Sequence, residues 1–122
     1  MNILLWVLQI LFGIYFTVIG VIHFTLPSGL PAAMSWMFDL SPTLHYVSGM
    51  AEILGGLGLI LPGITKIQTQ LTPLAGCGLV MVMIGAIIWH AQRSELQNIG
   101  LNMVLLLVAA FIAYGRWKLR PL

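Results

Sequence analysis

The chain has 122 residues, of which 60% are hydrophobic and 7% are charged, and its mean hydropathy is +1.04. This composition excludes an ordinary water-soluble domain and predicts an integral membrane protein. The net charge of +2 gives no reason to expect a nucleic-acid partner, so the lipid bilayer is the expected surrounding. Because four long apolar stretches leave little chain for a soluble part, we expect one membrane domain over residues 1–122.

The first apolar stretch, residues 2–24, contains no charged side chain. Its length matches the roughly 20 residues that an α-helix needs to cross the hydrocarbon core. A secretory signal would have a basic start, a shorter apolar run and a small-residue cleavage site, and this stretch lacks Lys and Arg. We therefore expect a membrane-spanning helix that is kept in the mature protein.

Three further apolar stretches predict helices over about residues 44–62, 73–90 and 99–115. The second helix is expected to stop at the breaker pair Pro62-Gly63, and the fourth is expected to close at Gly115 before a basic tail. The connections after the second and third helices are short, which favours antiparallel neighbours. The sequence therefore predicts an all-α polytopic protein, an antiparallel bundle of four transmembrane helices.

The longest connection, residues 25–43, separates the first two helices and contains three prolines around the apolar segment 32–38. An apolar segment with a central tryptophan, Trp36, favours the membrane interface over water. We expect either a short interfacial helix or a re-entrant lid over the mouth of the bundle, and the two alternatives stay open.

Four spans place both chain termini on the same side of the membrane. The basic residues on that side are the residue after the second helix and three in the tail: Lys66, Arg116, Lys118 and Arg120. The opposite side has Arg93 alone. The positive-inside rule then predicts cytoplasmic termini, with the tail as an anchor attracted to anionic lipid.

The polar residues in the apolar stretches gather toward the external side. All three histidines are there, because His23 ends the first helix, His45 opens the second and His90 ends the third. Asn98 and Asn102 lie at the start of the fourth helix, and Glu52 lies about two turns below His45, roughly 10 Å deep at 1.5 Å per residue. Each helix therefore contributes a polar group at one level.

Glycine spacing indicates which way Glu52 faces. Gly49, Glu52 and Gly56 fall at positions i, i+3 and i+7, so they share one stripe of the second helix. Because glycines allow close helix approach, we expect Glu52 to face protein and not lipid. The same seven-residue spacing recurs in the first and third helices, which completes a predicted set of packing glycines: Gly13, Gly20, Gly49, Gly56, Gly78 and Gly85.

An acidic residue inside a membrane helix is usually functional. We interpret Glu52, His23 and His90 as a ligand-binding or proton-handling group, with Asn102 and Tyr46 as further candidates. One alternative is a purely structural hydrogen bond between helices. Another is a metal site made of His23, Glu52 and His90, a known type of ligand set that here lacks any short ligand spacing.

Cys77 is the only cysteine, so an internal disulfide or a redox pair of cysteines is excluded, and its small neighbours suggest a packing role. No haem motif, phosphate-binding loop or nucleophile elbow occurs. Because no complete catalytic set is recognisable, the sequence leaves open whether the protein is an enzyme.

Several runs together resemble the DoxX-like family of small bacterial four-helix membrane proteins. They are Gly20-Val-Ile-His23, the central Gly49-Met-Ala-Glu52-Ile-Leu-Gly55 with its following Pro62, Met83-Ile-Gly85 with His90, and Ala113-Tyr-Gly115-Arg116. The resemblance implies a location in the bacterial inner membrane and importance for His23, Glu52 and His90. The family is named after a subunit of a quinol-oxidising complex, so the resemblance also suggests quinone as a candidate cofactor.

Two hypotheses of function follow. In the first, the protein is a redox-associated subunit whose external polar pocket around Glu52 binds a quinone or a similar amphiphile. In the second, it is a noncatalytic accessory or assembly protein whose glycine-lined helices pack against a partner or a second copy. A proton or small-solute transporter is a weaker third reading, because the long external loop and the position of Glu52 in the second helix fit it poorly.

Overall fold

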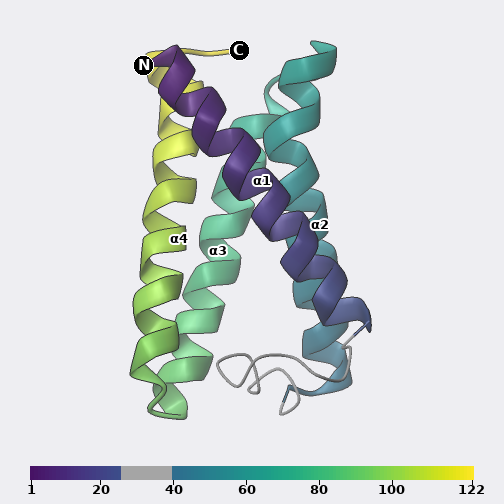
Figure 1. Ribbon diagram of the computed structural model, residues 1–122, viewed down its shortest axis with the longest axis vertical. Coiled ribbons are helices and arrows are strands. Elements are labelled where there is room, and N and C mark those ends of the chain that lie inside the picture. Colours follow the sequence, from purple (N-terminus) through teal and green to yellow (C-terminus); the bar gives the residue numbers. More distant parts are fainter. Residues whose placement is uncertain (26–39) are drawn as a thin grey trace.

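The computed structural model describes residues 1–25 and 40–122, and in these ranges the chain forms helices and no strand (Figure 1). The helices are α1 (Asn2–Thr25), α2 (Pro42–Thr65), α3 (Leu71–Gln92) and α4 (Leu96–Tyr114), and α4 continues into the π-helical turn η2 (Gly115–Leu119). The predicted all-α, four-helix membrane architecture is confirmed. The interfacial or re-entrant segment expected between the first two helices lies outside the described residues.

All four helices are long and apolar enough to cross a membrane. The spans contain 24, 24, 22 and 24 residues, and the fourth includes η2. At 1.5 Å per residue they measure about 33–36 Å, which exceeds the roughly 30 Å of bilayer hydrocarbon. Large apolar side chains point outward, as at Ile3 (79% exposed) and Met81 (72% exposed), where lipid would cover them. The chain is therefore a multi-pass membrane protein.

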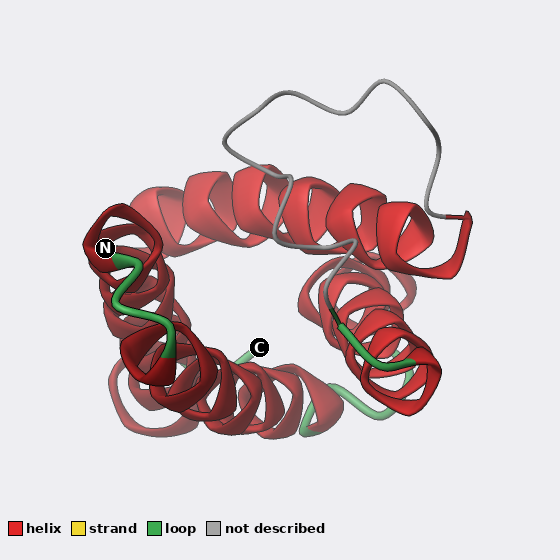
Figure 2. Ribbon diagram, turned by 90° about the horizontal axis from the view of Figure 1, so that it is seen from below, coloured by secondary structure: helices red, strands yellow, loops and turns green. Residues whose placement is uncertain are grey.

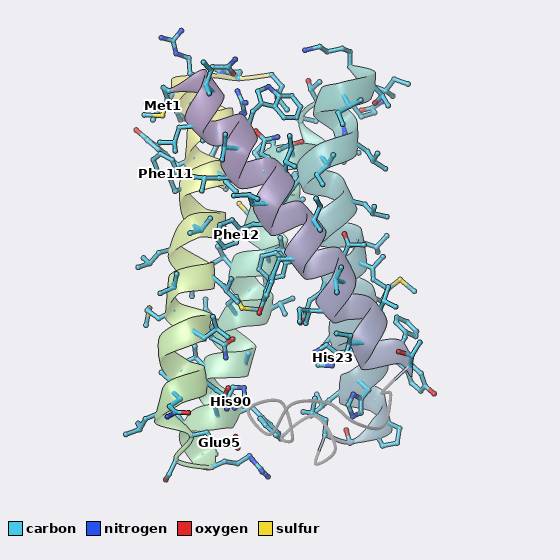
Figure 3. All side chains as sticks on the ribbon, in the orientation of Figure 1. Met1, Phe12, His23, His90, Glu95 and Phe111 are labelled. Atoms are coloured by element: carbon cyan, nitrogen blue, oxygen red, sulfur yellow. The ribbon has the colours of Figure 1, made fainter. Side chains whose placement is uncertain are left out.

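The helices alternate in direction, so both termini lie at one end of the bundle (Figure 1). We call this end the termini end, and the opposite end, where Figure 3 labels His23 and His90, the histidine end. Helix α1 runs diagonally from a position beside α4 at the termini end to a position over α2 at the histidine end (Figure 1). Seen from the histidine end, the four helices form a ring (Figure 2). The closest packing joins α1 to α2 and α3 to α4, whereas α1 and α4 touch little.

Paired glycines bring α1 and α2 into backbone contact. A Cβ atom added at Gly20 would lie 2.7 Å from the carbonyl oxygen of Gly49, and one added at Gly49 would lie 2.9 Å from that of Gly20. The same reciprocal contact joins Gly13 and Gly56, with distances of 2.9 and 2.6 Å. No side chain fits between the two helices at these levels, so glycine is required for this crossing.

The third helix departs from the expected glycine packing. A Cβ added at Gly78 or Gly85 would meet no atom within 4 Å among the described residues. Cys77 is likewise exposed, which corrects the expected packing role of its thiol. The two glycines differ from expectation because seven-residue spacing identifies a face of a helix without saying which neighbour covers it.

Helix α2 passes through Pro62 and ends at Thr65, so the predicted stop at Pro62-Gly63 is wrong. Proline cannot donate to the carbonyl four residues earlier, which here belongs to Gly58. The hydroxyl of Thr72 on α3 donates to that carbonyl oxygen at 2.9 Å, and the amide of Gln9 on α1 donates to the next carbonyl, that of Leu59, at 2.7 Å. Side chains of neighbouring helices thus compensate for the proline, as is usual inside membranes.

The fourth helix also extends further than expected at both ends. It begins at Leu96 and not near residue 99, and Gly115 continues the helical path into η2 instead of closing it. The backbone N–H of Arg120 donates to the carbonyl oxygen of Gly115 at 2.7 Å, the wider spacing of a π-helix. This turn directs Arg116 into the bundle.

Buried polar side chains occupy two levels separated by an apolar core. The termini-end group contains Gln9, Thr72 and Arg116, and the histidine-end group contains His23, His45, Glu52, His90 and Asn102. Between them lies a core of apolar residues from all four helices: Phe16, Leu59, Leu79, Met83, Leu105, Ala109 and Ile112. The polar residues predicted to gather at one level are therefore found together, and the second level is a separate feature.

Candidate ligand cavity at the histidine end

A cavity of about 450 Å³ lies at the histidine end and is lined by all four helices. Its volume falls in the range of about 300–1,000 Å³ that is typical of small-molecule sites. Most lining side chains are apolar, and a few polar groups are set among them: Tyr15, His23, Ser48, Glu52, His90, Asn98 and Asn102. A mainly apolar wall with a few polar groups suits an amphipathic molecule.

Glu52 faces the interior and is 4% exposed. Its Oε1 atom lies 3.6 Å from Nε2 of His23, an ion-pair distance that is slightly too long for a hydrogen bond. Its Oε2 atom is buried and has no hydrogen-bond partner among the described residues. The carboxyl group therefore pairs with a histidine on α1 and keeps one oxygen for another partner.

Two more buried polar side chains lie in this group. Asn102 on α4 lines the cavity, and its Nδ2 atom has no hydrogen-bond partner in the part of the chain that the structure describes. The ring of His45 lies 5.7 Å from the ring of His23, and within residues 1–25 and 40–122 neither of its nitrogens has a hydrogen-bond partner. Buried polar atoms without partners cost free energy, so the amide of Asn102 suits a ligand or water in the cavity, whereas His45 does not line it.

His90 lines the cavity from α3 but pairs with a different carboxylate, that of Glu95. The Nδ1 atom of His90 lies 2.9 Å from Oε1 of Glu95, and Nε of Arg93 donates to the same oxygen at 3.0 Å. The hydrogen bond from His90, followed by the bond and charge of Arg93, holds the pKa of the Glu95 carboxyl below its ordinary value. Figure 3 shows His90 and Glu95 together at the end of α3 and α4, apart from His23 near the end of α1.

Aromatic rings flank the cavity on two sides. Tyr15 and Phe16 line it from α1 and meet edge to face with ring centroids 5.5 Å apart. Trp89 lines it from α3, 5.1 Å from the ring of His90, and the guanidinium of Arg93 lies 4.6 Å from the Trp89 ring. Flat apolar walls of this kind favour a planar ligand.

Among the five polar candidates named from the sequence, Tyr46 does not lie at the cavity. It is 56% exposed and packs against the ring of Phe24, 5.6 Å away. Tyr46 therefore lies on the outer face of α2. His23, Glu52, His90 and Asn102 all line the cavity.

The metal alternative does not fit the geometry. No group of three or more His, Cys, Asp or Glu side chains close enough to hold a metal ion occurs within residues 1–25 and 40–122. His23 and Glu52 form one pair, while His90 is paired with Glu95 at the α3–α4 hairpin. The proposed ligand set is thus divided between two pairs.

Arg116 forms a second polar cluster at the termini end, where the sequence suggested only a membrane anchor. It is 2% exposed, and its guanidinium donates to Oε1 of Gln9 at 2.5 Å and to Oδ1 of Asn2 at 2.7 Å. It also lies 5.5 Å from the ring of Trp6. These contacts tie the end of the chain to the first turns of α1.

Some site residues could have been found from helical periodicity. Tyr15 lies eight residues before His23, two turns along the same face. Arg116 continues the buried stripe of α4 that contains Asn102, Leu105, Ala109 and Ile112, at alternating spacings of three and four. By contrast, Glu95 meets His90 across a turn in which Ser94 has a left-handed backbone (φ 58°), and no helical spacing rule predicts that contact.

Comparison with known proteins agrees with this architecture. A family model described as the DoxX-like family matches residues 7–112. The chain belongs to the DoxX-like family. The matched range contains every polar residue that lines the cavity of this DoxX-like protein. No curated protein and no solved structure matches the chain.

Proposed function

We propose that this DoxX-like protein binds a small, mainly apolar molecule with an oxygen-bearing head in the histidine-end cavity, and that Glu52 and His23 exchange a proton with that head. The observation that carries the proposal is an apolar cavity whose wall includes two buried polar atoms without partners among the described residues, Oε2 of Glu52 and Nδ2 of Asn102. When the carboxyl group is ionised, Oε2 of Glu52 accepts a hydrogen bond and suits a hydroxyl group of the ligand, whereas Nδ2 of Asn102 donates one and suits a carbonyl or hydroxyl oxygen.

A quinone is the ligand that we favour within this class. Its ring is planar, which suits the aromatic walls formed by Tyr15, Phe16 and Trp89, and its two oxygens gain or lose protons when the ring changes redox state. An intramembrane carboxyl beside an imidazole is a suitable proton acceptor or donor for such a ring. In this proposal the protein is a redox-associated subunit that holds the quinone for a partner.

The test is mass spectrometry of the molecules retained by gently solubilised protein from quinone-replete membranes, wild type beside Glu52→Gln. We expect nearly one equivalent of a quinone or similar amphiphile in the wild type. A hydrogen bond to a charged group is worth about 1.5–3 kcal/mol, so the variant should bind roughly 10- to 100-fold more weakly. Thr65→Val, an exposed change at the termini end, serves as the handling control. Ordinary phospholipid alone in all three samples would refute the proposal.

A second candidate function rests on the outer face of α2 and α3. A groove of about 470 Å³ there is lined mainly by small and aliphatic residues, among them Gly58, Ala75 and Gly78. A protein that packs a partner helix or a second copy into this groove would be a noncatalytic accessory or assembly subunit. Gly78→Leu would then abolish a complex or oligomer that survives Glu52→Gln, whereas an unchanged complex in Gly78→Leu would exclude this role for the groove.

For the location we propose the bacterial inner membrane with both termini in the cytoplasm. Exposed Lys66, Lys118 and Arg120 lie at the termini end, against Arg93 at the histidine end. Arg116 no longer counts as a surface charge because it is buried, yet the bias remains three to one. A reporter enzyme that works only outside the cytoplasm should be inactive when it is fused to the C-terminus. Activity of this fusion would overturn the proposed orientation.

A further inference from the structure

The histidine-end cavity and the groove on the outer face of α2 and α3 lie along one seam between these two helices. The residues of α2 that line the two hollows recur at spacings of four and three, so they share one stripe of the helix. Ala51 lines both hollows, so the hollows meet at this residue. The stripe on α2 consists of Leu44, Ser48, Ala51, Gly55 and Gly58.

Glycines leave the α3 side of the seam uncovered. Gly78 lines the groove and Gly85 lines the cavity, and their spacing of seven residues places them on one face of α3. A Cβ atom added at either glycine would meet no atom within 4 Å among the described residues. Beneath the groove the two helices are in contact, because a Cβ atom added at Gly58 would lie 2.7 Å from Cβ of Ala75. The seam therefore has a closed floor beside an open face of α3.

The shape and lining of the groove suit a single hydrocarbon chain better than a helix. All of its lining residues are Gly, Ala or Leu, so its occupant must be apolar. Leu54 on α2 and Leu74 on α3 line it and are 62% and 61% exposed. A helix about 10–12 Å across would meet these leucines before it reached the floor, whereas a narrow chain fits between them. From Ala51 to Gly58 the groove extends for about 10 Å along α2.

Polar atoms in the cavity indicate where the other end of such a chain would lie. Oε2 of Glu52 and Nδ2 of Asn102 are buried at the cavity wall and have no hydrogen-bond partner among the described residues. Glu52 directly follows Ala51, so the polar end of the cavity and the start of the groove lie at the same level of α2. One molecule with a polar head and an apolar tail would therefore occupy both hollows.

We propose that the ligand is a long-chain amphiphile whose oxygen-bearing ring lies in the histidine-end cavity and whose hydrocarbon tail passes Ala51 and lies in the groove between α2 and α3. The inference rests on the proposed function for the head of the ligand and adds a site for its tail. It assigns the groove to this tail and not to a partner helix.

The tail site is tested by photolabelling the purified protein in detergent micelles. The probe is a dimethoxy-methyl-benzoquinone with a decyl chain that ends in a diazirine, and mass spectrometry of the digested protein locates the label. We expect labels on the groove leucines Leu54 and Leu74, and few on the outward residues Val18 of α1 and Leu107 of α4, which are 51% and 59% exposed. An excess of the same benzoquinone without the chain should suppress the groove labels, because it occupies the head site.

A leucine at Gly78 should block the tail without disturbing the head. The open space at this position accepts a larger side chain, and Gly78 does not line the cavity. Gly78→Leu should therefore lose most of the groove label, while equilibrium dialysis shows unchanged binding of the benzoquinone without the chain. Gly100→Leu is the matched control, because Gly100 on α4 has the same open space among the described residues and lines neither hollow.

The possible results separate this inference from the proposed function. Labels spread evenly over the outward faces of all four helices, with the chainless benzoquinone still bound, would overturn the tail site and leave the cavity function intact. Failure of the wild type to bind either benzoquinone would refute the proposed quinone ligand, and the tail site would fall with it. Groove labels that the chainless compound does not suppress would overturn the link between head and tail. A dimer in light scattering that Gly78→Leu dissolves would assign the groove to a second copy instead.

Discussion

Replacing Gly49 with alanine should push α1 away from α2 at the level of the candidate site. The added Cβ would lie 2.9 Å from both the carbonyl oxygen of Gly20 and Cδ2 of Phe24, and 3.1 Å from Cβ of His23. To restore the 3.4 Å at which ordinary contact begins, α1 must move by about 0.5 Å. One of these contacts is with backbone, which cannot rotate aside as a side chain can.

Gly49→Ala should lower the free energy of unfolding by about 1–3 kcal/mol, which is the usual cost of overpacking at a well-packed site. At Gly78, where an added Cβ meets no atom within 4 Å in the described ranges, the same change should be neutral or stabilise by up to about 1 kcal/mol through helix propensity. For a chain of this size 1 kcal/mol corresponds to roughly 4 °C in the unfolding midpoint. We therefore expect the unfolding midpoint of Gly49→Ala to lie about 4–12 °C below that of Gly78→Ala.

The assay is thermal unfolding of detergent-purified variants, followed by tryptophan fluorescence on monodisperse samples. Because Gly49 also contacts His23, the displaced α1 should lengthen the 3.6 Å contact between His23 and Glu52, and the variant should retain less of the bound amphiphile. Equal midpoints for Gly49→Ala and Gly78→Ala would refute the claim that backbone contact between α1 and α2 sets the geometry of the site.

Three other outcomes are expected. Thr72→Val removes the hydroxyl that donates to the carbonyl oxygen of Gly58, and this loss should lower the free energy of unfolding by about 1–3 kcal/mol. The unfolding midpoint should fall accordingly, whereas the exposed change Thr65→Val should leave the midpoint nearly unchanged. Gln9→Leu removes one acceptor of the buried Arg116 guanidinium and should lower the free energy of unfolding by more than about 1 kcal/mol in the same assay; an unchanged midpoint would show that this cluster is not structural. Glu95 has a folded-state pKa below its ordinary 4.5, so its stabilising contribution is full above that pH and is lost as the pH falls through the folded pKa. Unfolding midpoints of the wild type and Glu95→Gln should therefore converge in acid, and a difference that grows in acid would contradict the assigned hydrogen bonds.

The sequence by itself determined the membrane class, the number of helices and the shared end of the termini. The physical reason is that each span must satisfy its own backbone hydrogen bonds across a hydrocarbon layer of known thickness, so length and hydropathy decide the architecture. It also predicted that Glu52 faces inward, because a carboxyl group that faces lipid costs free energy and the neighbouring glycines mark a face that packs against protein. The gathering of polar residues at one end followed from the alternating directions of the helices.

Tertiary structure decided how each helix is rotated and what it meets. Tyr46 faces outward, Gly78 lacks a neighbour among the described residues, and α2 continues through Pro62 because Thr72 of another helix replaces the missing donor. The division of the histidines between Glu52 and Glu95 likewise depends on the crossing of α1 over α2 and on the α3–α4 hairpin. Periodicity gives the faces of one helix, but contacts between helices depend on crossing angles and side-chain volumes that no single segment contains.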